Sequence, residues 1–165
     1  MDFMAGAEKF SDRMSTPAVL EKMIAAGWLG RKSGRGFYVH ERGGKSSALN
    51  QDADRLRQND SERGWDRAEL QARMVLLMVN EAARCLEESV VAEAVDVDFG
   101  MIMGTGFAPF RGGPLRYADT EGVTILAAAM QRLADAGEPR FAPCELVRTL
   151  AARDGKFYDE REKPL

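Results

Sequence analysis

The chain has 165 residues, with 23 Lys and Arg against 26 Asp and Glu, and a formal net charge of −3. A composition of 45% hydrophobic and 30% charged residues is typical of a globular protein and argues against general disorder. The sequence contains no apolar run of the roughly 18 residues that a membrane span needs, no recognisable secretory signal, and no basic excess that would favour nucleic-acid binding. We therefore expect a cytoplasmic protein with no membrane span and no nucleic-acid partner.

Residues that commonly carry catalysis or bind metal are scarce. The chain has two cysteines, Cys85 and Cys144, and a single histidine, His40. Two cysteines are too few for a disulfide framework or a Cys-rich zinc site, and one histidine cannot build a His-based metal cluster. We therefore expect no metal site. We interpret His40 as a histidine beside a linker, although its residue type also permits general-base catalysis.

The first helix is predicted between Pro17 and Gly27. Proline suits the first helical position, because its missing N–H would have no partner there, and glycine suits the left-handed residue that follows a helix end. Three glycines among basic residues at 28–36 then predict a turn. The aromatic and β-branched residues at 37–39 favour a short extended arm.

A polar stretch at 41–65 separates this segment from the rest of the chain. Its composition is typical of a linker, and residues 52–59 favour a short polar helix within it. Asp66 then opens the longest helical pattern, and Glu69 three residues later completes a capping-box sequence. The helix is predicted to reach about residue 90, with an apolar stripe at steps of three and four, formed by Leu70, Met74, Leu77, Met78, Ala82, Cys85 and Leu86.

The remainder predicts shorter helices joined by loops. Asp96 is placed to cap a helix at 97–103. Two prolines and three glycines interrupt regular structure between Gly106 and Pro114, where two phenylalanines favour burial. The last three helical patterns are at 115–119, 121–136 and 143–155. The predicted fold class is therefore all-α, with one short extended arm after the first helix.

The two helices that begin with proline resemble each other. Pro17 and Pro143 lie 126 residues apart, the residues after them match at several positions, and a Phe-Tyr pair follows each helix. We interpret this as an internal duplication, with chance similarity between short helices as the alternative.

A duplication would divide the chain into three parts. Residues 1–40 would be the tail of a first helical copy, residues 41–65 a linker with a possible short helix, and residues 66–165 a second copy. The chain would then be a piece of something longer or a shortened relative.

Three segments resemble a known family. Residues 29–38 (LGRKSGRGFY) look like the end of the C-terminal helical domain of 3-hydroxyacyl-CoA dehydrogenases. Residues 80–88 (NEAARCLEE) and 104–119 (GTGFAPFRGGPLRYAD) resemble the second copy of that domain, which occurs in the multifunctional α-subunit of fatty-acid β-oxidation complexes. The resemblance covers about residues 10–40 and 70–158, and it implies a helical domain of this type.

The catalytic machinery of that family is not matched. In the family, a Rossmann domain holds NAD and a His–Glu pair, and an asparagine assists. This sequence has no G-x-G-x-x-G after a strand, which a dinucleotide site needs for the pyrophosphate. Neither His40 nor Asn80 matches the catalytic histidine or the assisting asparagine. The resemblance therefore implies a chain that is inactive alone and binds no cofactor itself, while NAD belongs to the full-length enzyme.

Two groups of residues are candidates for binding. Aromatic side chains in a rigid, glycine-flanked loop suit an interface anchor or the wall of an acyl pocket, with a buried corner between helices as the alternative. This loop comprises Phe107, Pro109, Phe110, Arg111, Gly112, Gly113 and Pro114. Cations in a glycine-rich turn suit contact with the phosphates of CoA, with solvated charges as the alternative. They are Arg31, Lys32 and Arg35.

The leading hypothesis is a non-catalytic helical part of a 3-hydroxyacyl-CoA dehydrogenase, which serves assembly and completes the acyl-CoA cleft. Its partner would be the Rossmann domain of the same enzyme or a homodimer mate. The alternative is a stand-alone dimeric module for acyl-CoA binding or assembly, because a truncated copy would expose an apolar face.

Overall fold

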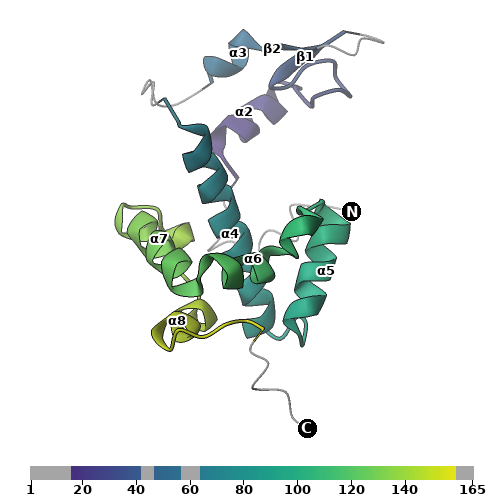
Figure 1. The fold of residues 1–165 in the computed structure, drawn as a ribbon. Helices are drawn as coiled ribbons and strands as arrows, with labels where there is room; N and C mark the ends of the chain where they lie inside the picture. The colour runs from purple at the N-terminus through teal and green to yellow at the C-terminus, as the bar shows by residue number, and fades with distance from the viewer. Residues whose placement is uncertain (1–15, 42–46, 57–63, 159–165) are drawn as a thin grey trace. The chain divides into compact units, whose positions relative to one another are not determined.

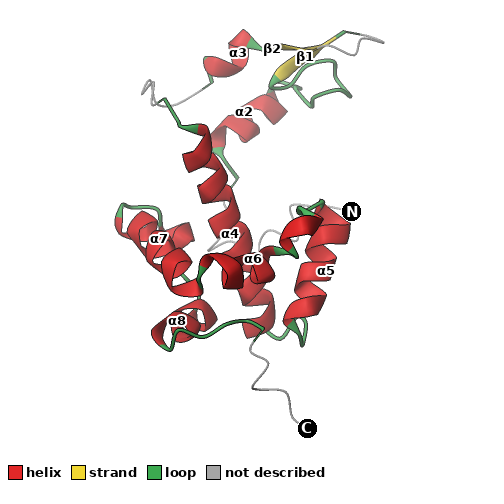
Figure 2. Ribbon diagram, viewed as in Figure 1, coloured by secondary structure: helices red, strands yellow, loops and turns green. Residues whose placement is uncertain are grey.

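The computed structural model describes residues 16–41, 47–56 and 64–158. The chain divides into two compact units, Met1–Gly64 and Trp65–Leu165 (Figure 1). Helices dominate the described residues, and strands occur in the first unit (Figure 2). The predicted all-α class is therefore confirmed.

The first unit begins with helix α2 (Ala18–Ala25). Pro17 stands just before the helix as its N-cap, rather than at the first helical position as predicted. Gly27 has a φ of +73°, so the left-handed residue after the helix is confirmed. Met23 is the buried residue of this helix.

A small hairpin and a short helix follow α2 in the first unit. Strand β1 (Tyr38–His40) pairs antiparallel with strand β2 (Ser47–Leu49), and Tyr38 lies opposite Leu49. The extended arm is confirmed, but its partner strand lies in the stretch expected to be a linker. Helix α3 (Gln51–Asp54) follows at once, capped by the side chain of Asn50, so it begins earlier than predicted. Residues 57–59 of the predicted helix lie outside the described residues.

The second unit is built around one long helix, α4 (Arg67–Glu87), which contacts the other helices of the unit. These helices are α5 (Ala94–Thr105), α6 (Pro114–Glu121), α7 (Val123–Asp135) and α8 (Glu145–Ala152). Two short 3-10 helices, η2 (Pro109–Arg111) and η3 (Pro139–Phe141), lie between them. The fully buried side chains that fill the core include Val79, Leu115, Met130, Phe141 and Val147.

The start of α4 is confirmed, because the Asp66 side chain accepts a hydrogen bond from the Glu69 N–H. The predicted apolar stripe is only partly buried. Met74 is 58% exposed, whereas Leu76 and Val79 are buried. The segment from residue 74 to 79 is apolar throughout, so helical spacing alone does not identify the face that packs.

Several predicted helix boundaries are corrected by one to three residues. Helix α5 begins at Ala94 with Glu93 as N-cap, so Asp96 lies inside the first turn instead of capping it. Gly104 lies within α5, and Gly106 ends the helix with a φ of +75°. Gly122 separates α6 from α7, which begins two residues later than predicted.

Candidate functional site

The glycine-rich loop after α5 has two faces with opposite exposure. Phe107 is 8% exposed and belongs to the buried side, whereas Phe110 is 87% exposed. The 3-10 helix η2 carries Phe110, and Gly112 ends that helix with a φ of +76°. The predicted buried corner therefore holds for Phe107, whereas Phe110 is exposed to solvent.

Arg111 is held at the edge of the loop. Its Nη1 lies 3.7 Å from Oε1 of Glu121, at the end of α6. Its guanidinium carbon lies 5.0 Å from the Tyr117 ring centre and 5.9 Å from that of Phe110. These contacts are exposed, and each contributes a fraction of a kcal/mol to about 1 kcal/mol. Arg111 therefore adds little to the stability of the loop.

The loop is anchored by Asp98, a buried residue of α5 that belongs to none of the predicted sites. Its Oδ1 accepts a hydrogen bond from the Leu115 N–H at 2.8 Å, and its Oδ2 accepts one from the Arg116 N–H at 2.9 Å. Both N–H groups belong to the first turn of α6, where the helix leaves donors without intrahelical partners. Asp98 therefore caps α6 from a neighbouring helix, a role that a carboxylate suits because the helix N-terminus is partly positive.

Gly113 makes room for this carboxylate. Its φ is +104°, and a Cβ at this position would lie 2.3 Å from the Cβ and Cγ of Asp98. Pro114 follows as the first residue of α6 and is buried, which suits a residue without an N–H. The Gly-Gly-Pro part of the predicted surface therefore has a packing role inside the unit.

The second Phe-Tyr pair, Phe157 and Tyr158, also forms hydrogen bonds with α5 and α6. The Tyr158 hydroxyl donates a hydrogen bond to Asp98 Oδ2 at 2.7 Å. The N–H groups of Phe157 and Tyr158 donate to the carboxylate of Asp119, at 2.8 and 3.0 Å. Burial, together with the neighbouring Asp98 carboxylate, raises the pKa of Tyr158. The arrangement keeps the hydroxyl protonated and holds residues 157 and 158 against α5 and α6.

The other motif of the second unit, residues 80–88, also has structural contacts. Asn80 is 1% exposed, accepts a hydrogen bond from the Cys144 N–H at 2.9 Å and donates one to the Ala142 carbonyl at 2.9 Å. Glu87 accepts from the Leu146 N–H at 2.9 Å, and this bond is the main cause of its lowered pKa. Both side chains thus hold the segment that leads into α8.

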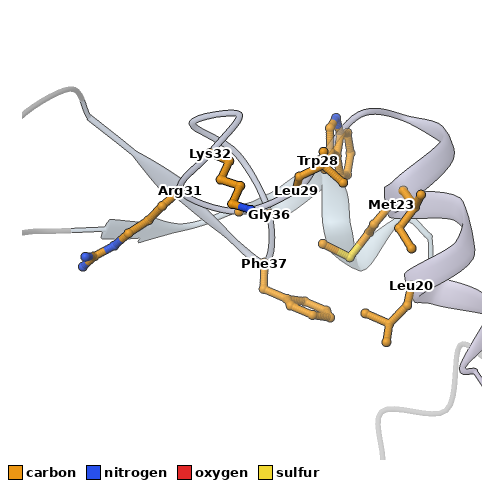
Figure 3. A pocket seen from close by; sticks show the side chains of 10 residues that line it. Leu20, Met23, Trp28, Leu29, Arg31, Lys32, Gly36 and Phe37 are labelled. Atoms are coloured by element: carbon orange, nitrogen blue, oxygen red, sulfur yellow. The ribbon is translucent and has the colours of Figure 1, made fainter. Parts of the chain in front are cut away.

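In the first unit, the glycine-rich turn and α2 line an open, largely apolar hollow of about 590 Å³ (Figure 3). Leu20 from α2 and Phe37 from the end of the turn point toward each other across it. Arg31 and Lys32 are exposed at its edge. Lys32 lies along the turn with its ammonium group toward Gly36, while Arg31 extends away from the hollow.

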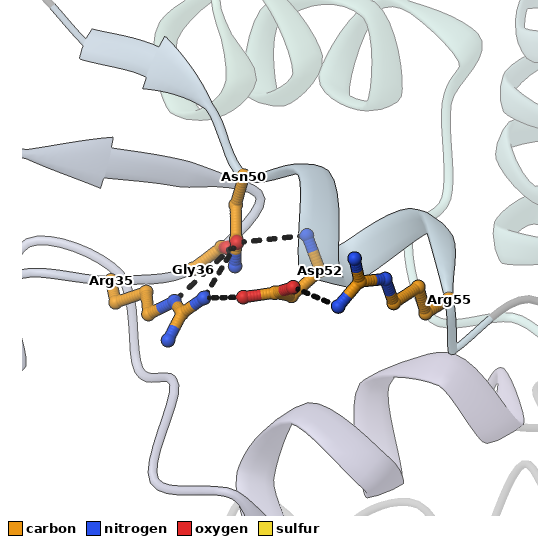
Figure 4. A network of polar contacts seen from close by, with 5 residues as sticks. All are labelled: Arg35, Gly36, Asn50, Asp52 and Arg55. Carbon is orange, nitrogen blue, oxygen red and sulfur yellow. Dashed lines mark hydrogen bonds and ion pairs between the residues drawn. The ribbon is translucent and has the colours of Figure 1, made fainter.

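Arg35 occupies a different environment from the other two cations (Figure 4). Its guanidinium pairs with Asp52 and donates to Asn50 Oδ1 at 3.1 Å, and it lies 4.4 Å from the ring centre of Trp28. Asn50 is 5% exposed and also donates to the Gly36 carbonyl at 2.8 Å. This network joins the turn to α3, which no spacing in the sequence indicated.

Among the described residues, few side chains are arranged for catalysis or metal binding. His40 lies on β1 opposite Ser47 and is partly exposed. Within the described ranges, no group of three or more His, Cys, Asp or Glu side chains could hold a metal ion, and no helix is long and apolar enough to span a bilayer. The glycine turn leads into β1 rather than into a helix, so it does not form the helix N-terminus that a dinucleotide pyrophosphate requires.

Comparisons with known proteins agree on one family. The family model described as 3-hydroxyacyl-CoA dehydrogenase, C-terminal domain, matches residues 70–161. The fatty acid oxidation complex subunit alpha of Shewanella frigidimarina (strain NCIMB 400) is 38% identical over 156 residues. That match covers 92% of this chain and 21% of the relative, so the chain spans about a fifth of the relative's length.

Proposed function

The chain belongs to the family of the 3-hydroxyacyl-CoA dehydrogenase C-terminal domain, and from this premise we propose that it acts as the C-terminal helical part of such a dehydrogenase in fatty-acid β-oxidation. In this role it serves subunit or domain assembly and completes the acyl-CoA cleft, and it is not catalytic alone. The observation that carries the proposal is the family match over residues 70–161. The relative's name, a subunit of a fatty acid oxidation complex, supports the pathway.

The proposed partner is the Rossmann domain of the same enzyme or a homodimer mate, and NAD would bind to that Rossmann domain. The glycine turn of this chain precedes a strand, a geometry that does not suit a pyrophosphate. We also propose a cytoplasmic location. Residues 1–40 are proposed to be the tail of a first helical copy, residues 41–65 a linker, and residues 66–165 a second copy.

Phe110 is the proposed anchor of the assembly surface. A phenylalanine that is 87% exposed, on a 3-10 helix that Gly112 ends, presents apolar area on backbone that is already ordered before binding. Phe107 and Gly113 support this surface from inside.

We expect Phe110→Ser to weaken association with the dehydrogenase part while leaving the unfolding temperature unchanged. Ile125→Ser, a matched change at a 66% exposed residue of α7, serves as the control.

Contact with the phosphates of CoA is proposed for the basic turn. Arg31 and Lys32 are exposed, and neither side chain has a hydrogen-bond or ion-pair partner within the described residues. Arg35 is the weaker member of the predicted set, because Asp52 and Asn50 already engage its guanidinium.

A stand-alone dimeric acyl-CoA-binding or assembly module is the second candidate. Its support is an apolar row on α5, where Val95, Phe99 and Met103 recur at steps of four and are 50%, 65% and 71% exposed. Such a row favours association with another apolar surface. Light scattering tests this candidate: a monomer at high micromolar concentration would contradict it, whereas a homodimer is compatible with both candidates.

NADH formation tests the leading candidate. The chain alone, mixed with NAD and a 3-hydroxyacyl-CoA, is expected to give no NADH. Added to a family dehydrogenase truncated before its C-terminal helical domain, it is expected to bind that fragment and raise its rate. Robust turnover by the chain alone, or absence of any complex with the fragment, would contradict the proposal.

A further inference from the structure

We propose that Met103 of α5 is a site of reversible oxidation, at which peroxide converts the thioether to a sulfoxide and makes the outer face of this helix polar. The outer face consists of Val95, Phe99 and Met103, which follow one another at steps of four along α5. This inference goes beyond the proposed function, because neither candidate there involves a covalent change to the chain.

Met103 is the most exposed methionine among the residues that the structure describes. It is 71% exposed and Met74 is 58% exposed, whereas Met23 and Met130 are 3% and 0% exposed. Oxidation of a thioether requires contact between the sulfur and the oxidant, so susceptibility follows exposure. A peroxide in solution can therefore reach Met103, while the fold shields the methionines of the core.

Met103 also has little part in the packing of α5. This helix packs on α4 and α6 (Figure 1), and its inner side carries the buried Val97 and Asp98 and the core-packed Met101. Met103 lies two residues after Met101, which is about 200° further around the helix. A Cβ on the neighbouring Gly104 would enter open space. An oxygen added to the Met103 sulfur is therefore expected to meet solvent, and the fold tolerates it.

The oxidation needs one equivalent of hydrogen peroxide and no protein group besides the thioether. A lone pair of the Met103 sulfur attacks one peroxide oxygen, and the O–O bond breaks. The proton of the transferred hydroxyl passes to the departing hydroxide, which gives water. The sulfur is oxidised by two electrons and the peroxide is reduced by two. A methionine sulfoxide reductase reverses the change with two thiols, which become a disulfide while the oxygen leaves as water.

The sulfoxide changes the chemical character of the outer face. A thioether is a soft apolar group, whereas a sulfoxide is polar, so oxidation replaces the most exposed member of the apolar row with a polar group. Phe99, one turn earlier and 65% exposed, then has a polar neighbour. Association through this face is expected to weaken on oxidation, and this consequence alone rests on the second candidate under the proposed function.

Peptide mass spectrometry after peroxide treatment tests the site. The full chain is incubated with hydrogen peroxide at pH 7, catalase stops the reaction, and fragment ions locate each sulfoxide. We expect Met103 to be oxidised within about threefold of the rate of N-acetylmethionine amide, and Met130 at least about thirtyfold more slowly than Met103. In urea the two rates should become equal, because the fold no longer shields Met130.

Reversibility and tolerance by the fold are measured separately. The two methionine sulfoxide reductases, one for each sulfoxide epimer, are added with dithiothreitol to the oxidised native chain and should return Met103 to the thioether. Met103→Gln, a polar replacement of similar length, is expected to keep the unfolding temperature of the unmodified chain.

Retention on a hydrophobic-interaction column reports the polarity of the outer face. Peroxide treatment should shorten the retention of a Met74→Leu chain, in which the other largely exposed methionine of the described residues is removed. Adding Met103→Leu is expected to reduce that shift. Met101→Leu, at a partly buried position of the same helix, is the matched control and should leave the shift unchanged.

Four results would overturn the site. The first is oxidation of Met103 in the native chain no faster than that of Met130, and the second is a Met103 sulfoxide that both reductases leave in place. The third is a lowered unfolding temperature of Met103→Gln, and the fourth is an equal retention shift with Met103→Leu and with Met101→Leu. None of these measurements involves NADH formation or the dehydrogenase fragment, so failure of this site and failure of the proposed function are distinguishable.

Discussion

Asp98 joins three segments of the second unit through one carboxylate. It accepts hydrogen bonds from two N–H groups at the start of α6 and from the Tyr158 hydroxyl, while itself belonging to α5. A buried carboxylate is costly unless such donors surround it. Because Gly113 has no side chain, the start of α6 can approach the Asp98 carboxylate closely. Gly113 and Asp98 therefore depend on each other.

Gly113→Ala is therefore expected to lower the free energy of unfolding by about 3 kcal/mol or more, through backbone strain and the clash with Asp98. Gly137→Ala is the matched control, because Gly137 also has a positive φ, +95°, but its Cβ would enter open space. We expect that variant to lose about 1 kcal/mol. Urea unfolding measures both, and equal losses would show that the close approach to Asp98 has no energetic role.

Asn80 uses both ends of its amide in the core. Asn80→Asp keeps the shape but replaces the donor to the Ala142 carbonyl with a carboxylate oxygen. We expect a loss of about 3 kcal/mol at neutral pH, because a buried carboxylate would face a carbonyl. The deficit should shrink as the pH falls, since the protonated carboxyl can donate again. Urea unfolding at pH 7 and pH 4.5 tests this, and a deficit independent of pH would exclude the lost donor as its cause.

At the scale of elements, the sequence predicted the helices better than their ends or their packing. Pro17, Gly27, Asp66 and Gly106 mark boundaries through local chemistry, and the structure places all four at helix ends. The cap of α6 could not be predicted in this way, because Asp98 lies on another helix. Strand β2 was missed for a similar reason, since three residues in a polar stretch become a strand only through their partner β1.

In the loop from Gly106 to Pro114, local structure was also easier to predict than packing. Its glycines and prolines correctly indicated a shaped turn, yet the opposite exposure of Phe107 and Phe110 depends on tertiary packing that no spacing encodes. Arg35 likewise has the same residue type as Arg31 and also follows a glycine, but Asp52, distant in sequence, engages it.

The contact between α4 and η3 gives a prediction about acid. Arg73 of α4 pairs with Glu138 beside η3, and the Arg73 hydrogen bond lowers the pKa of Glu138. A carboxyl whose pKa is lower in the folded state stabilises the fold above its unfolded pKa, near 4.3, and that stabilisation is lost as pH falls through the folded pKa. Glu138→Gln should cost about 1 kcal/mol at pH 7 and less below pH 4. Thermal unfolding at several pH values measures this, and equal differences at pH 7 and pH 3 would contradict it.

At the scale of the whole molecule, the second unit has the features of an independently folding body. Its core draws on α4, α6, α7 and α8, and Cys144 lies within it at 2% exposure. Burial raises the pKa of the Cys144 thiol to about 11, so the thiolate is scarce at pH 8. Reaction of this thiol with iodoacetamide therefore requires that the unit opens.

We expect a fragment of residues 65–165 to fold alone, with Cys85→Ser leaving Cys144 as its single thiol. Labelling of Cys144 at pH 8 should be at least about a thousandfold slower than in urea, since a domain of this size has several kcal/mol of stability. Leu150→Ala, at 2% exposure, should accelerate labelling, whereas Ile125→Ala, at 66%, should not. Labelling of the native fragment as fast as in urea would show that the second unit needs further chain to complete its core.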